Sequence, residues 1–123
     1  MEVGVVRLHT VQVRRAYDAP EDTDGVRVLV DRLWPRGLAK EKASLDEWCK
    51  QIAPSSDLRK WYHHDADRFE EFERRYREEL ADPERTEALE HPRGIARTRH
   101  LTLITATKHP EISEAEVLAR NLA

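Results

Sequence analysis

The chain of 123 residues contains a single cysteine, Cys49. One cysteine excludes an internal disulfide and any metal site built from cysteines alone, and it fits a reducing cytoplasm. Cys49 lies in the stretch SLDEWCKQI, where no neighbouring histidine would activate the thiol. We expect it to be a small buried or half-buried side chain.

Long apolar runs and an excess of one charge are also missing. No segment approaches the roughly 18 apolar residues of a membrane span, and MEVGVVRLHTVQVRR lacks the charged-then-apolar order of a secretion signal. The 21 basic residues face 24 acidic ones, which gives a net charge of −3. These absences predict a soluble cytoplasmic protein without a membrane partner, in which any basic site is a local cluster.

Several catalytic motifs are absent. The sequence has no glycine-rich phosphate loop, no dinucleotide-binding fingerprint and no Gly-x-Ser-x-Gly turn, which argues against ordinary NTPase, dehydrogenase and serine hydrolase chemistry. It also has no internal repeat. Its length fits one domain over residues 1–123, long enough to bury a core without disulfides or metals.

The apolar pattern predicts three strands and several helices. Val26–Val30 is apolar apart from Arg27, which is typical of a parallel strand buried on both faces. Strands are expected at 3–13, 26–30 and 100–107, and helices at 45–52, 55–62, 69–80 and 114–122. This order predicts an α/β domain with a small, mostly parallel sheet flanked by helices.

Capping signals set the helix boundaries. Ser44 with Glu47 and Ser113 with Glu116 have the spacing of capping boxes, and Asp65 is placed to cap the helix over 69–80. Residues 82–99 are polar and punctuated by two prolines and a glycine. We therefore expect a loop there, with at most a helical turn over 84–89.

Polar side chains follow two of the predicted strands, at the edge where ligands of open parallel sheets gather. The stretch DRLWPRG follows the strand at 26–30, TATKH follows the last strand, and a serine opens a helix that carries an arginine one turn in. Helix N-termini and guanidinium groups both suit anions. The ligand-binding residues expected here are Arg32, Trp34, Arg36, Ser55, Arg59 and Lys108.

Structural alternatives remain open for these residues. Asp31 can pair with Arg32 or Arg36 as a brace between strand end and loop, and Trp34 can pack under the loop instead of covering a planar ligand. Ser55 is read first as a helix cap.

The segment HHDAD, residues 63–67, raises two further hypotheses. Adjacent histidines point apart in a strand and lie about 100° apart on a helix, so they chelate a metal poorly, and no zinc spacing is present. A histidine-based metal binder therefore stays a second alternative. His64 and Asp31 are the candidate acid-base residues, because an imidazole titrates near neutrality.

Three stretches carry a resemblance to a known family. RVLVDRLWPRGLAKEKASLDEW, IAPSSDLRKWYHHD and FERRYREEL closely resemble the YeaO-like family, a bacterial domain of unknown function numbered 488, over about residues 11–122. The positions matching its pattern are Asp31, Arg32, Trp34, Pro35, Arg36, Gly37, Ser55, Arg59, Trp61, His64 and Tyr76.

The resemblance implies an α/β fold but no established activity. Longer members carry a cysteine and a Cys-His-Arg segment after the last strand, where this chain has TATKHPEISEAEVL without cysteine. Close relatives show Lys-Asp and an asparagine at the place of Lys108 and His109. If that aspartate is needed for activity, this chain has altered chemistry or binds without reaction.

The sequence therefore supports a small anionic ligand, phosphate-bearing or nucleotide-like, at the strand ends, and leaves open whether a hydrolase or transferase reaction follows. The rival hypothesis is a non-catalytic nucleic-acid or regulatory binding module. The net charge argues mildly against nucleic acid. A purely structural motif is a third reading, and Trp34, Trp48 and Trp61 fit a homodimer interface as well as a core. No cofactor is specified.

Overall fold

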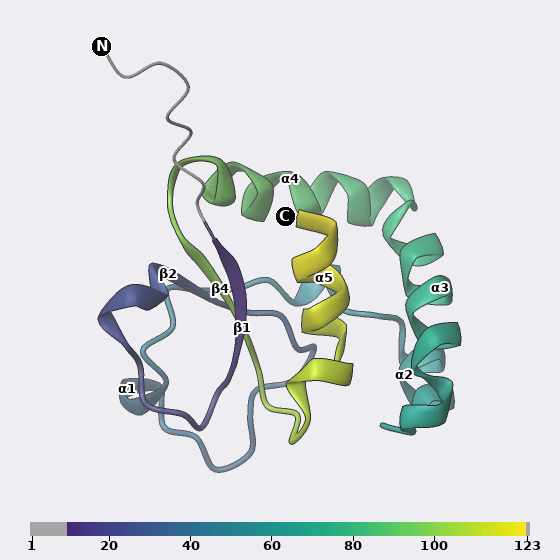
Figure 1. The fold of residues 1–123 in the computed structure, drawn as a ribbon, viewed down its shortest axis with the longest axis horizontal. Coiled ribbons are helices and arrows are strands. Elements are labelled where there is room, and N and C mark those ends of the chain that lie inside the picture. Colours follow the sequence, from purple (N-terminus) through teal and green to yellow (C-terminus); the bar gives the residue numbers. More distant parts are fainter. Residues whose placement is uncertain (1–9, 123) are drawn as a thin grey trace.

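Four parallel strands form the centre of the structure (Figure 1). The computed structural model describes residues 10–122. The strands run in the order β1-β4-β2-β3 and are β1 (Val11–Arg15), β2 (Val26–Leu29), β3 (Glu47–Trp48) and β4 (Leu101–Thr105). Every neighbouring pair is parallel. The predicted α/β class with a small parallel sheet is thus confirmed.

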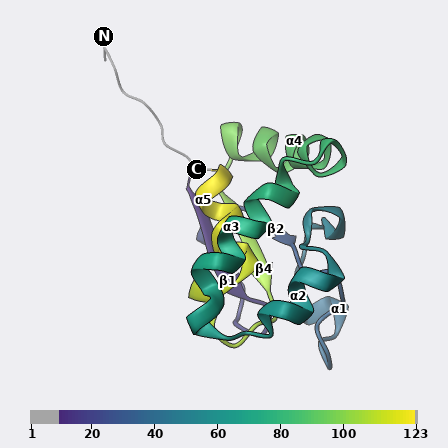
Figure 2. The ribbon, with the colours of Figure 1, turned by 90° about the vertical axis from the view of Figure 1, so that its right-hand side faces the viewer.

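Five helices surround this sheet in the described residues: α1 (Lys40–Ala43), α2 (Ser56–Tyr62), α3 (Phe69–Leu80), α4 (Pro83–Thr98) and α5 (Glu114–Leu122). Short 3₁₀ turns lie at Asp22–Asp24, Lys50–Ile52, Ala66–Arg68 and Pro110–Ile112. Figures 1 and 2 show α3 and α5 lying against one another, with α5 also packed on β1 and β4. None of the helices described is long and apolar enough to cross a membrane.

Both faces of the sheet are buried, which explains why β2 is apolar apart from Arg27. Successive residues of a strand point to opposite faces. Val28 belongs to the large cluster formed with the helices, whereas Leu29 joins Ile104 in a smaller cluster on the other face. Trp34 and Leu38, from the loop after β2, pack against this smaller cluster.

The helix expected at 45–52 is wrong. Ser44 ends the short helix α1 in a left-handed conformation, with φ of 49°, and β3 follows it. The amide of Cys49 donates to the carbonyl of Leu29 at 2.8 Å, so this segment extends the sheet beside β2. Pairing with an open strand edge therefore overrode the local capping signal.

The loop expected at 82–99 is also wrong, because these residues form α4. Pro83 occupies the first turn, where a missing N–H costs nothing. Pro92 lies inside the helix and is buried together with Leu89. Packing of this apolar face compensates for the backbone bond that Pro92 cannot make.

Other boundaries match more closely. Ser55 caps α2 as predicted, and the aromatic stripe at 69–80 is α3. Asp65 accepts from the amide of Asp67 and caps a 3₁₀ turn that leads into α3. The strand expected at 3–13 begins at Val11, and residues 1–9 lie outside the described part of the chain. α5 begins after Ser113, whose hydroxyl donates to the carbonyl of Pro110 at 2.7 Å.

A buried ion pair lies at the amino end of β2, opposite to the predicted site. Nη1 of Arg27 is 2.5 Å from Oδ2 of Asp24, and the two residues are 4% and 1% exposed. The same guanidinium donates to the carbonyls of Ala43 and Ser44, both at 3.1 Å. The pair therefore ties β2 to the end of α1.

We predict that Asp24→Ala lowers the free energy of unfolding by about 3–5 kcal/mol, because it leaves the Arg27 charge buried without its carboxylate. Urea denaturation followed by circular dichroism measures this. The exposed Asp22→Ala in the same turn is the control and should change stability by about 0.5 kcal/mol or less. Equal effects of the two substitutions would contradict the role given to the pair.

Two glycine-to-alanine substitutions should change the free energy of unfolding in opposite directions. Gly25 has φ of +66°, and a Cβ there would lie 2.2 Å from the carbonyl oxygen of His100, so Gly25→Ala should cost more than about 1 kcal/mol. Gly94 lies in α4 with nothing within 4 Å of an added Cβ, so Gly94→Ala should stabilise by about 0.5–1 kcal/mol. Thermal melts of both variants test this, and a stabilised Gly25→Ala would contradict the close approach.

Candidate functional site

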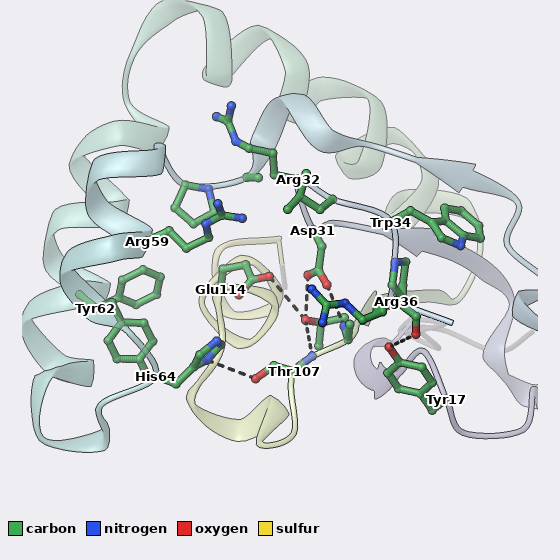
Figure 3. A pocket seen from close by; sticks show the side chains of 17 residues that line it. Tyr17, Asp31, Arg32, Trp34, Arg36, Arg59, Tyr62, His64, Thr107 and Glu114 are labelled. Atoms are coloured by element: carbon green, nitrogen blue, oxygen red, sulfur yellow. Dashed lines mark hydrogen bonds between the residues drawn. The ribbon is translucent and has the colours of Figure 1, made fainter. Parts of the chain in front are cut away.

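A cavity of about 480 Å³ opens where the carboxyl ends of the central strands meet (Figure 3). The amide of Val30 donates to the carbonyl of Ile104, and the amide of Ala16 donates to that of Thr105, which brings three strand ends together. Six of the eight residues predicted for the site line the cavity: Asp31, Arg32, Trp34, Arg36, Arg59 and His64. Ser55 and Lys108 do not.

Asp31 lies on the cavity floor and makes no ion pair with Arg32 or Arg36. Its Oδ1 accepts from the hydroxyl of Thr105, and its Oδ2 accepts from the amide of Ala106, both at 2.8 Å. Asp31 therefore joins the end of β2 to the end of β4. The ion pair expected as a structural alternative is therefore not formed, and Asp31 instead bonds neutral donors at the end of another strand.

Glu114, the first residue of α5, is a site residue that the sequence analysis missed. Burial of its carboxyl group raises the pKa of Glu114 well above its usual value, and the hydrogen bond to the Asp31 carboxyl and the negative charge of Asp31 raise it further. Oε1 of Glu114 also lies 3.5 Å from the Thr105 hydroxyl. The floor of the cavity thus holds two neighbouring carboxyl groups.

The arginines give the cavity its positive charge. Arg32, Arg36 and Arg59 are all exposed, and no hydrogen bond or ion pair within residues 10–122 involves their guanidinium groups. In Figure 3, Arg36 and Arg59 reach toward the cavity from the loop after β2 and from α2, whereas Arg32 points away. The carbonyl of Arg36 accepts from the hydroxyl of Tyr17 at 2.9 Å, which fixes this loop.

Trp34 packs under the loop after β2. Its Nε1 donates to the carbonyl of Leu38 at 2.8 Å, and its ring meets Trp48 edge-on with centroids 5.6 Å apart. Trp34 touches the cavity but is half-buried in the smaller apolar cluster. Of the two alternatives for this residue, these contacts favour packing.

Ser55 acts as a helix cap. Its hydroxyl accepts from the amide of Leu58 at 3.1 Å and binds the carboxylate of Glu79, whose other oxygen accepts from the Ser55 amide at 2.8 Å. The N-terminus of α2 is thereby satisfied within the chain. Lys108 is exposed and lies one residue beyond Thr107, which does line the cavity.

His64 stands at the rim in a left-handed conformation, with φ of 55°. Its Nδ1 lies 3.5 Å from the hydroxyl of Thr107. Among residues 10–122, no group of three or more histidine, cysteine, aspartate or glutamate side chains is arranged to hold a metal ion. The histidine-based metal site is left without further support from the described residues.

An aromatic wall closes the cavity beside α2. Tyr62 stacks on Phe72 with centroids 4.2 Å apart, and its hydroxyl donates to the carbonyl of Ile112 at 2.5 Å. Burial, with smaller contributions from Glu114 and Asp65, raises the pKa of Tyr62 to about 12. This side of the cavity is therefore apolar and un-ionised at neutral pH.

Comparison with known proteins gives the family. Residues 10–123 match a family model described as "Inactive DUF488-N3 subclade". An uncharacterized protein of Mycobacterium tuberculosis is 46% identical over 118 residues, covering 96% of this chain and 98% of the relative. The uncharacterized protein YeaO of Escherichia coli is 42% identical over 109 residues, covering 89% and 93%.

No solved structure matches the chain. The family match extends over nearly all of the sequence, including the DRLWPRG loop, α2 and α5 that form the cavity. On this evidence the chain belongs to the YeaO-like DUF488 family.

Proposed function

We propose that this protein binds a small phosphate-bearing anion in the cavity at the strand ends and does not convert it. The observation that carries the proposal is the pair of guanidinium groups, Arg36 and Arg59, that face the same cavity without a partner among residues 10–122. A guanidinium fork donates two parallel hydrogen bonds to a phosphate or carboxylate. The ligand would satisfy donors that the described chain leaves free.

The charge balance favours an anion. Asp31 contributes one negative charge, Arg36 and Arg59 contribute two positive charges, and the raised pKa of Glu114 favours its neutral form. The sum over these groups is +1. A cavity of about 480 Å³ also exceeds the space that inorganic phosphate fills, and its aromatic wall suits an attached sugar or base.

Binding without turnover fits the acid-base candidates as the structure arranges them. Both oxygens of Asp31 already accept hydrogen bonds from the chain, and His64 stands at the rim beside Thr107. The matching subclade model carries the word "Inactive" in its description. The chain also lacks the cysteine-containing segment that longer members of the family carry after the last strand.

The nucleic-acid alternative has less support. An extended basic stripe is required for it, but arginines of α3 are paired within their own helix, as Arg74 is with Glu71 and Glu78. Paired charges of this kind offer little attraction to a phosphate backbone. The exposed arginines of the cavity form a local cluster instead.

We predict that inorganic phosphate and adenosine monophosphate bind the wild type, whereas adenosine, which lacks the phosphate, does not. Arg36→Ala and Arg59→Ala should each weaken binding about tenfold or more, because a hydrogen bond between charged groups contributes about 1.5–3 kcal/mol. Isothermal titration calorimetry measures the affinities. A saturating ligand, at about 100 times its dissociation constant, should raise the melting temperature by roughly ten degrees.

Arg97→Ala is the matched control, since Arg97 is an exposed arginine at the far end of α4. It should bind phosphate as the wild type does. Absence of binding by every phosphate compound would refute the proposal. Affinity that depends steeply on salt and requires a polynucleotide would favour the nucleic-acid alternative.

A further inference from the structure

The two carboxyl groups on the cavity floor carry an inference that rests on the proposed anion site. We propose that Asp31 and Glu114 share a single proton, and that this proton determines whether the cavity accepts an anion. Glu114 is then a specificity-determining residue of the site: as a neutral acid it admits an anion, and as a carboxylate it repels one.

The surroundings of the two carboxyl groups assign the charge to Asp31 and the proton to Glu114. Asp31 accepts from the Thr105 hydroxyl and the Ala106 amide, both at 2.8 Å, and such donors stabilise a carboxylate. Glu114 has weaker support: its own backbone amide and the Thr105 hydroxyl, at 3.5 Å, favour its charged form less than burial and Asp31 oppose it. Two carboxylates in contact do not ionise together without a large cost.

Arg32, Arg36 and Arg59 line the same cavity as Glu114, but in the described part of the chain none of them forms a hydrogen bond or an ion pair with its carboxyl group. Burial, and to a smaller extent the negative charge of Glu114, raise the pKa values of Tyr62 of α2 and Tyr76 of α3, so these phenol groups offer no positive charge. Within residues 10–122, no ion pair involves Glu114. Charged groups of neighbouring elements have contacts of their own: Arg15 donates to the Thr107 carbonyl, Arg120 pairs with Glu73 and Glu116, His109 pairs with Glu111, and Arg85 donates to the Ala53 carbonyl.

Loss of the shared proton removes the net positive charge of these groups. With the proton in place, Arg36, Arg59 and Asp31 sum to +1, and without it the second carboxylate brings the sum to zero. The new charge would lie on the floor, within the cavity that the anion enters. Anion affinity is therefore expected to fall as pH rises through the pKa of Glu114.

The test is calorimetric binding of inorganic sulfate between pH 5 and 9 at fixed ionic strength, because sulfate keeps a constant charge over this range. If binding requires one proton, wild-type affinity falls by up to about tenfold per pH unit above the pKa of Glu114. Glu114→Gln should lose most of this fall, because its amide stays neutral and has the same shape.

Two controls separate Glu114 from other titrating groups. Glu84→Gln replaces another glutamate in the first turn of a helix, away from the cavity, and should keep the wild-type fall. His64→Gln removes the imidazole of the rim, whose own loss of charge would also weaken anion binding. The fall should persist in His64→Gln if Glu114 is responsible.

Stability provides a readout that needs no ligand. A carboxyl group whose pKa is higher in the folded chain than in the unfolded chain contributes stability at low pH. This contribution is lost as pH rises from the pKa of the unfolded chain through that of the folded chain. The unfolding equilibrium constant of the wild type should therefore increase by up to about tenfold per pH unit in that window. Glu114→Gln should show a smaller change over the same window.

The outcomes are distinguishable. Sulfate that binds equally well at pH 5 and pH 9 would overturn the shared proton while leaving the anion site intact, as would a Glu114→Gln variant that keeps the wild-type fall. Absence of sulfate and phosphate binding at every pH would overturn the anion site, and with it the control of affinity by Glu114. A fall in affinity that Glu114→Gln abolishes and His64→Gln retains would establish the inference.

Discussion

The carboxylate of Asp31 joins two strand ends that lie 74 residues apart in the sequence, through the hydroxyl of Thr105 and the neighbouring amide of Ala106. This connection fixes the start of the loop after β2. It therefore also determines where the side chains of that loop lie relative to the cavity. The Thr105 hydroxyl also lies 3.5 Å from Glu114, so the same connection includes the start of α5. One acidic side chain thus sets the geometry of three elements that form the site.

The DRLWPRG loop divides its residues between support and binding. Trp34 packs on the second face of the sheet, beside Leu29 and Ile104, and its indole N–H is used within the loop. This packing fixes the backbone, so that Arg36 can stay exposed at the cavity without an internal partner. A buried strand runs directly into charged residues because the loop must cover one face of the sheet and line a cavity beyond its end.

The sequence predicted the parts of the fold that have their own periodicity. β2 is mostly apolar and α3 has an apolar stripe, so both were located from local pattern alone. β3 has no such pattern, because its two residues are held by bonds to β2. α4 was missed because two prolines and a glycine signal a loop, and only packing of Leu89 and Pro92 stabilises the helix.

The same distinction applies to the site. Arg36 and Arg59 could be predicted because polar residues follow a buried strand and a helix start. Ser55 caps α2 and does not line the cavity, and the sequence could not separate these roles because a cap and an anion-binding serine look alike. Glu114 was missed because an acid in the first turn of a helix is ordinary there. Only the folded chain brings it to Asp31.

The strand order of the sheet also determines when its hydrogen bonds can form during protein synthesis. β4 is a central strand, yet it follows β1 and β2 by most of the chain length, with Val11 paired to Leu101. β1 and β2 cannot complete their hydrogen bonds until β4 has left the ribosome. The apolar side chains of β2 are therefore exposed on the nascent chain for most of translation.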